Sequence, residues 1–99
     1  MTKQEYLDAA EETLVEREAA KGKEWNGSLD AQVNLACQMA LMDVGVRSLN
    51  QPVQVLEGNH AGLIAPIVMI DWNEAAVRLK GCPVWFCVWG DPGRIRVVR

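Results

Sequence analysis

Long apolar runs are missing from this chain of 99 residues. No stretch approaches the roughly 18 consecutive apolar residues that a membrane-spanning helix requires. Residues 1–20 also contain no apolar segment of the kind found in signal peptides. Because apolar residues still make up 49% of the composition, disorder is excluded as well. We therefore expect one small folded protein without a membrane segment.

Cysteine and the common ligand-binding motifs are also scarce. The three cysteines, Cys37, Cys82 and Cys87, are an odd number and include no CxxC pair, which argues against a disulfide framework and a zinc knuckle. Free thiols are typical of a reducing compartment, so the predicted location is cytoplasmic. Neither GxGxxG nor GxxxxGK[ST] occurs, which leaves nucleotide binding without support. We expect no metal and no cofactor.

Catalytic residues are equally few. His60 is the only histidine, and a general base needs a hydrogen-bonding partner in a site that excludes water. Cys82 and Cys87 lie in or beside a predicted buried strand, where thiols are inert. The carboxylates cluster on one predicted helix and include no inward-facing pair. Acid–base hydrolysis needs two carboxylates that face a common substrate, so the sequence does not support it. The sequence predicts a non-catalytic protein, with a small enzyme using His60 as the alternative.

The first half of the chain is acidic and helical. Residues 1–50 hold nine acids and five bases, a net charge of −4. Thr2 and Glu5 form a capping-box pattern that predicts a helix to about Ala20. Ser28 is a plausible N-cap of a second helix that ends near Gly45 and carries two apolar stripes. Residues 1–50 are therefore predicted to form a two-helix unit whose second helix is sandwiched between layers.

The second half has the periodicity of strands. Alternating or β-branched segments predict five strands in an α+β protein, at residues 53–56, 63–70, 76–80, 84–89 and 94–98. Turns are expected at residues 71–74 and 90–93 because of their composition. An alternative reading places a short helix at residues 71–80, which gives an open α+β layer.

One pattern in this half resembles a known family. Val53-x-Val55-x-x-Gly58-x-x-Ala61-Gly62, followed by Ile67-Val68-x-Ile70-Asp71, resembles the KOW-type opening of an SH3-like barrel. The resemblance covers residues 52–98 and implies that the five strands close into a small barrel. Family members occur in ribosomal proteins and transcription elongation factors, where the barrel contacts RNA or protein. The predicted fold is thus a helical hairpin, residues 1–50, packed on an SH3-like barrel, residues 51–99, with one shared core.

Two departures from the family pattern weaken the transfer of RNA binding. Ala61 stands where the family often has a basic residue before the loop glycine, and Ala65-Pro66 replaces the second expected glycine. These changes affect the predicted RNA binding more than the predicted barrel fold, because proteins of one fold can have different functions.

The leading functional hypothesis is a protein–protein interaction module. Tryptophan is enriched in the hot spots of interfaces, and an acidic helix face suits a basic partner. The predicted partner-binding residues are Glu11, Glu12, Glu16, Glu18, Trp25, Trp72, Trp85 and Trp89. By analogy of size and charge with small phage proteins such as anti-CRISPR proteins, the module would inhibit or modulate a nucleic-acid-handling complex. Faces of the second helix or the Trp85 strand left uncovered would favour a homodimer.

Direct RNA or single-stranded DNA binding is the alternative. Arg78, Lys80, Arg94 and Arg96 are predicted to line one outer face of adjacent strands, with Trp72 as a stacking platform. The net charge of −3 argues against this hypothesis, because nucleic-acid-binding domains usually carry a basic excess.

Overall fold

The computed structural model describes residues 1–90 and 92–98 and has the α+β class predicted from the sequence. Its elements are α1 (Lys3–Ala20), α2 (Leu29–Asp43), β1 (Pro52–Val55), β2 (Ile64–Asp71), β3 (Ala76–Leu79), β4 (Trp85–Cys87), the short 3-10 helix η1 (Pro92–Arg94) and β5 (Ile95–Val97). The alternative helix at residues 71–80 is wrong, because a turn and strand β3 occupy that segment. The turn predicted at residues 90–93 includes Asp91, which lies outside the described residues.

Both helices begin where their capping residues predict. The Thr2 hydroxyl accepts a hydrogen bond from the Glu5 amide at 3.2 Å, and the Glu5 carboxylate accepts one from the Thr2 amide at 3.1 Å. The Ser28 hydroxyl caps α2 by accepting from the Ala31 amide at 3.4 Å. Each cap satisfies amides that the first helical turn would otherwise leave unpaired. Gly45, at a φ of +90°, follows the end of α2 and lets the chain turn towards the sheet.

The five strands form one antiparallel sheet in the order β4-β3-β2-β1-β5. The prediction of a closed barrel is wrong, because β4 and β5 are the two edges of the sheet and are not paired with each other. Both edge strands are only three residues long, which leaves little backbone for another ladder. Side chains bring the edges near one another instead: the Arg94 guanidinium lies 5.7 Å from the centre of the Phe86 ring.

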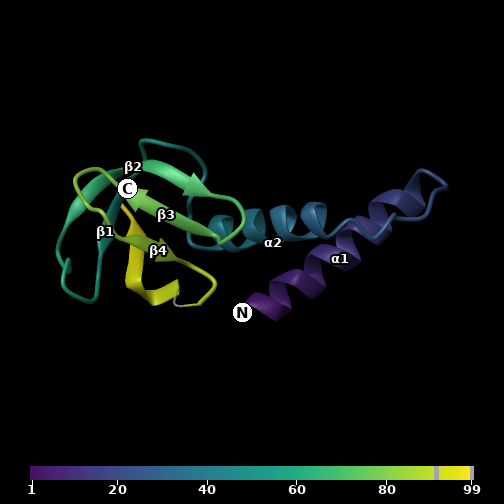
Figure 1. Ribbon diagram of the computed structural model, residues 1–99, viewed down its shortest axis with the longest axis horizontal. Coiled ribbons are helices and arrows are strands. Elements are labelled where there is room, and N and C mark those ends of the chain that lie inside the picture. Colours follow the sequence, from purple (N-terminus) through teal and green to yellow (C-terminus); the bar gives the residue numbers. More distant parts are fainter. Residues whose placement is uncertain (91, 99) are drawn as a thin grey trace.

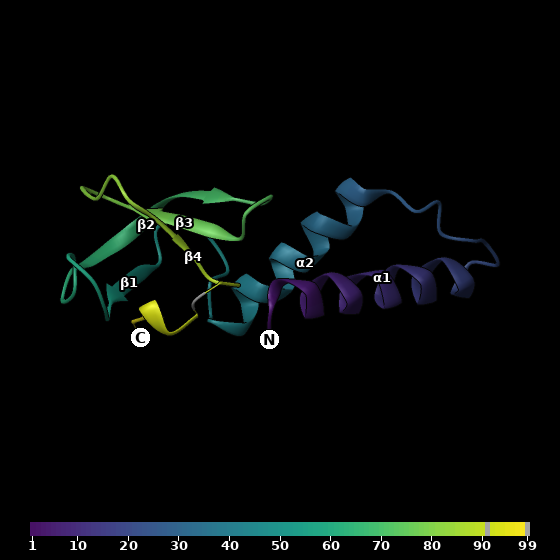
Figure 2. The same cartoon turned by 60° about the horizontal axis from the view of Figure 1, so that its bottom comes forward.

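The helices project from one end of the sheet, so the molecule measures 49 × 22 × 22 Å (Figure 1). Only the C-terminal half of α2 meets the sheet end, and its buried residues are Ala36, Cys37, Ala40 and Leu41. None of residues 11–35 is buried, and Figure 2 shows the two helices diverging towards their connecting loop. The expectation of a second helix sandwiched between layers therefore applies to the second half of α2, which holds all of its buried residues.

One cluster of buried side chains links the helices to the sheet. Tyr6 and Ala10 of α1 join the buried residues of α2 and the inner face of the sheet. Phe86, Leu41, Ile67 and Leu79 are the largest fully buried members. Cys37 lies within this cluster, and burial raises the pKa of its thiol to about 11. Within the described residues, neither helix is both long and apolar enough to cross a bilayer.

Candidate interaction surface

Four large apolar side chains are exposed around one groove. Met42, Leu49, Met69 and Trp72 are 56%, 51%, 45% and 42% exposed, respectively. They line two adjoining hollows of about 270 and 320 Å³, which share Arg47 and Trp72. We call this surface the Trp72 groove, and its residues are Gln38, Met42, Val46, Arg47, Ser48, Leu49, Val68, Met69, Ile70 and Trp72. Exposed apolar side chains gathered in one place are typical of a binding surface, whereas scattered ones are ordinary.

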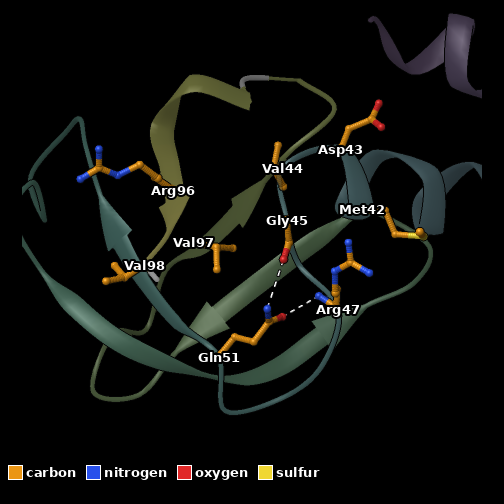
Figure 3. Close-up of a pocket in the computed structure, with 9 residues that line it drawn as sticks. All are labelled: Met42, Asp43, Val44, Gly45, Arg47, Gln51, Arg96, Val97 and Val98. Atoms are coloured by element: carbon orange, nitrogen blue, oxygen red, sulfur yellow. Dashed lines mark hydrogen bonds between the residues drawn. The ribbon is translucent and has the colours of Figure 1, made fainter.

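Gln51 fixes the connector between α2 and β1 that forms one wall of the groove. Its side-chain oxygen accepts hydrogen bonds from the amides of Arg47 and Ser48, and its side-chain nitrogen donates to the Gly45 carbonyl at 3.1 Å (Figure 3). The next residue back, Asn50, donates its amide to the Ile67 carbonyl of β2 at 2.8 Å. These bonds hold the connector against the sheet, so Arg47 and Leu49 sit on a defined backbone.

The turn between β2 and β3 presents Trp72. The Asp71 carboxylate accepts hydrogen bonds from the amides of Asn73 at 2.9 Å and Glu74 at 3.2 Å. An aspartate that bonds the backbone two and three residues ahead closes a tight turn. Trp72 lines one hollow together with Gln38 and Met42 of α2. Trp72 is thus held by a structured turn while a large part of its surface stays in contact with water.

A third, more polar hollow of about 880 Å³ continues from the groove around the end of α2 (Figure 3). It is lined by Met42 and Arg47 on one side and by Arg96, Val97 and Val98 of the β5 segment on the other. Asp43 also lines it, and its carboxylate accepts a hydrogen bond from the Tyr6 hydroxyl at 2.6 Å. Arg47 therefore lies at the junction of all three hollows.

The charge of the Trp72 groove is positive. Arg47 is the only charged residue that lines its two hollows, and no carboxylate lines either one. Across residues 1–90 and 92–98, the one ion pair within 4 Å is Lys21 with Glu18, at 3.5 Å. The Arg47 guanidinium therefore has no acidic partner within the described part of the chain, although the chain as a whole carries a net charge of −3.

The outer face of the sheet extends the groove towards Trp85. Met69, Arg78 and Trp85 are directly opposite one another on β2, β3 and β4. Residues paired in this way point to the same side of a sheet. Trp85 is 39% exposed, so a predicted partner-binding residue lies on the same face as Met69.

The structure does not bring the other predicted partner-binding residues to this surface. Glu11, Glu12 and Glu16 are exposed on α1, and Glu18 is half-buried beside Lys21. Trp25 is half-buried in the loop between the helices. Trp89 is only 5% exposed and belongs to the core, with the Lys3 ammonium 5.1 Å from its ring centre. Trp89 is therefore unavailable for docking.

The basic residues predicted to bind nucleic acid are dispersed. The expectation that they lie on adjacent strands is wrong, because β2 and β1 separate β3 from β5. Arg78 is on β3 and Lys80 just beyond it, whereas Arg96 is on β5 and donates to the Gln54 side chain at 2.6 Å. Arg94 lies over Phe86 instead of facing outward freely. Trp72 is in the turn at the far end of β2.

No hydrogen bond within residues 1–90 and 92–98 joins His60 to Cys82 or Cys87, the residues considered for catalysis. His60 lies in the turn between β1 and β2 and is half-buried. Cys82 is buried after β3, and the Cys87 thiol donates to the Glu74 carbonyl at 3.1 Å. Among the described residues, no group of three or more histidine, cysteine, aspartate or glutamate side chains could hold a metal ion.

Sequence reasoning missed most of the groove. The sequence pattern identifies Met42 only as a member of an apolar stripe on the second helix. No pattern in the neighbouring residues predicts a binding role for Leu49 or Arg47. Met69 lies in an apolar segment whose alternation is interrupted by the register shift between Ile67 and Met69. That bulge turns Met69 outward, and a pattern of apolar residues cannot reveal a bulge before pairing is known.

Comparison of the chain with protein-family models, with curated proteins and with solved structures finds no match.

Proposed function

We propose that this chain is a non-catalytic protein-binding module that docks a partner protein at the Trp72 groove. The single observation that carries this proposal is the gathering of four exposed apolar side chains, Met42, Leu49, Met69 and Trp72, around two adjoining hollows. Covering apolar surface contributes roughly 25 cal/mol per Å², so a partner that seals the groove gains affinity directly.

The residue types support protein binding. Tryptophan supplies a large rigid contact area and is enriched among residues that dominate binding energy. Methionine has a flexible, polarisable side chain that adapts to the shape of a partner. The groove combines Trp72 with Met42 and Met69, and the hydrogen bonds of Gln51 and Asp71 fix the backbone beneath. A partner would therefore meet adaptable side chains on an ordered frame.

The other hypotheses have weaker support. Direct nucleic-acid binding lacks a continuous basic surface, because Arg78 and Arg96 lie on strands that are not neighbours. An enzyme using His60 has less support, because His60 lies in the turn before β2 whereas the Cys87 thiol bonds Glu74 in the turn after β2. A role as an inhibitor of a nucleic-acid-handling complex, or a phage origin, rests on small size and net charge alone. The proposal therefore stops at protein binding.

Affinity capture with matched variants tests this proposal. The tagged chain is expressed in the cells that make it, and bound proteins are quantified by mass spectrometry for the original chain, Trp72→Ala, Leu49→Ala and Leu29→Ala. Leu29 is 66% exposed and lies at the start of α2, so its variant controls for the loss of an exposed leucine. We expect one partner that is retained by Leu29→Ala and lost by both groove variants.

The acidic face of α1 supplies the contrasting variant. If Glu11→Lys abolishes capture while Trp72→Ala and Leu49→Ala do not, the contact surface is α1 and the proposal is wrong.

A further inference from the structure

We infer that the occupant of the Trp72 groove is an extended, acidic segment of the partner protein, which adds a strand to the open edge of β2 at residues 68–71. This inference rests on the proposed function, because it names the conformation and the chemistry of the partner at the same site. Three features carry it: the pairing of β2, the backbone groups of Ile70 and the charge of Arg47.

Strand β2 is covered along only part of the edge that faces away from β3. On that edge, β1 pairs with residues 64–66. The connector then bonds Ile67, whose carbonyl accepts from the Asn50 amide at 2.8 Å and whose amide donates to the Gln51 carbonyl at 3.0 Å. Residues 68–71 pair with β3 on their other side and have no strand partner here.

The chain leaves this edge at Asn50. Its φ of +69° is left-handed, a conformation that asparagine tolerates and that turns the chain. No backbone hydrogen bond joins residues 45–49 to residues 68–71, all of which the structure describes. The hollow of about 320 Å³ is lined by both segments, with residues 47–49 of the connector on one side and residues 68–70 of β2 on the other.

Ile70 directs its backbone groups towards this open edge. Neighbours on antiparallel strands alternate between pairs that exchange backbone hydrogen bonds and pairs that do not. The Lys80 amide donates to the Pro66 carbonyl at 2.9 Å, so Lys80, and Arg78 two residues before it, bond β2. Because Met69 is opposite Arg78 and Ile70 follows it, the Ile70 amide and carbonyl point away from β3. No group in the described part of the chain bonds either one across this edge.

An added strand satisfies these groups and a helix does not. Any partner that seals the hollow removes the Ile70 amide and carbonyl from water, and buried backbone groups without a partner cost free energy. An extended segment in line with β1 supplies an amide and a carbonyl to bond them, whereas a helix has already used its own internally. Alternate side chains of such a segment can cover Leu49 and Met69, which are exposed around the hollow.

The charge of Arg47 selects an acidic segment. Arg47 is the only charged residue that lines the two apolar hollows, and the described residues place no acid within 4 Å of it. The nearby Asp71 carboxylate is occupied by the amides of its turn. A carboxylate that meets Arg47 gains a charge-assisted, often bidentate hydrogen bond, whereas a basic segment would be repelled.

Nuclear magnetic resonance of a bound peptide tests the inference with the complete chain. A displayed library of fully randomised peptides is selected on the chain, and we expect enriched aspartate or glutamate beside apolar residues. One selected peptide is synthesised and added to the isotope-labelled chain. We expect Overhauser contacts of the strand-pairing type between the Ile70 amide and the peptide backbone. The Ile67 amide, which Gln51 already occupies, is the matched control and should show no such contact.

Affinities of changed peptides and variants provide the second readout. Replacing the peptide amide that donates to the Ile70 carbonyl by an ester should weaken binding about fivefold, and an ester one residue along should not. Trp72→Ala and Arg47→Glu should each weaken binding by at least about tenfold. Lys23→Glu makes the same change of charge in the loop between the helices, where the side chain is exposed, and should leave the affinity unchanged.

The outcomes separate the inference from the proposal beneath it. Peptides that require Trp72 but bind as helices, without backbone contacts to Ile70, overturn the inference and leave the Trp72 groove as the docking site. Peptides that bind Arg47→Glu as well as the original chain also overturn it. Contacts to Ile70 from a second copy of the chain, in a sample of mixed labelling without peptide, would contradict a partner segment. If the selected peptides bind Trp72→Ala as tightly as the original chain, both the inference and the docking site are wrong.

Discussion

The Tyr6 hydroxyl donates a hydrogen bond to the Asp43 carboxylate at 2.6 Å and so joins the first turn of α1 to the last residue of α2. Tyr6 is 6% exposed, and its ring belongs to the core. Asp43 precedes the connector that carries Arg47 and Leu49. The bond therefore links the N-terminal helix to the segment on which the Trp72 groove depends.

Removing this hydrogen bond should weaken the fold modestly. Tyr6→Phe keeps the buried ring and deletes only the hydroxyl, so we expect the free energy of unfolding to fall by about 1 kcal/mol. Chemical denaturation with two spectroscopic probes measures this change. Asp43→Asn, which keeps an acceptor for the hydroxyl, should cost less than Tyr6→Phe. Equal stability of Tyr6→Phe and the original chain would show that the bond contributes nothing.

Alkaline pH should destabilise the protein. Burial and the Asp43 carboxylate raise the pKa of Tyr6 from 10.0 to about 12, and burial raises the pKa of Cys37 from 9.0 to about 11. Because both pKa values are higher in the folded state, the unfolded state loses these protons first as pH rises. The stability that depends on them is complete below pH 9 and is lost progressively as pH rises from 9 to about 12.

The single tyrosine of the chain allows a direct check. Phenolate absorbance should titrate near pH 12 in the folded protein and near 10 in denaturant. A folded-state midpoint at 10 would contradict the buried hydrogen bond. In Tyr6→Phe, the decline in stability between pH 10 and 12 should become shallower.

Trp72 and Trp89 should respond to alanine in opposite ways. Trp89 is 5% exposed and part of the core, so Trp89→Ala should lower the free energy of unfolding by about 3–5 kcal/mol. Trp72 is 42% exposed, so Trp72→Ala should cost much less stability but abolish partner binding. Denaturation curves and captured partner are measured for both variants. A Trp72→Ala protein as unstable as Trp89→Ala would assign Trp72 to the core instead of to the groove.

Gln51 should position the groove without touching the partner. Its side chain bonds the Gly45 carbonyl and the amides of Arg47 and Ser48, so Gln51→Ala should release the connector and lower stability by about 1–2 kcal/mol. Gln51→Glu keeps the acceptor and loses the donor to Gly45, so its effect should be intermediate. Amide hydrogen exchange should quicken at residues 47–48 in Gln51→Ala. Unchanged exchange there would refute the positioning role.

Local signals predicted the elements well because each depends on neighbouring residues. The Thr2-Glu5 capping box, the Ser28 cap and the alternation around Arg78 act over a few positions and appear in the structure as predicted. The failures arose where distant residues decide. Whether β4 pairs with β5 depends on how far the sheet curls, and the bulge before Met69 depends on the register of β2 with β3.

The candidate site was harder to predict than the fold for the same reason. The Trp72 groove combines the end of α2, the connector and a turn that lies about 25 residues further along the chain. The composition of residues 71–74 predicts a turn and therefore an exposed Trp72. Leu49 and Arg47 become part of a surface only because the connector packs beside β2, which no local pattern predicts. Trp89 falls with Trp85 in the strand predicted at residues 84–89, but strand β4 ends at Cys87 and Trp89 is buried in the core.

Photo-crosslinking from Leu49 tests most directly whether the Trp72 groove holds a partner. A photoreactive amino acid replaces Leu49 in one variant and Leu29 in another, since both leucines are exposed, at 51% and 66% respectively. In cells that make the protein, Leu49 should form a covalent adduct with one partner, and the adduct should disappear when Trp72→Ala is added. Adducts from Leu29 alone, with none from Leu49, would contradict the assignment of the groove.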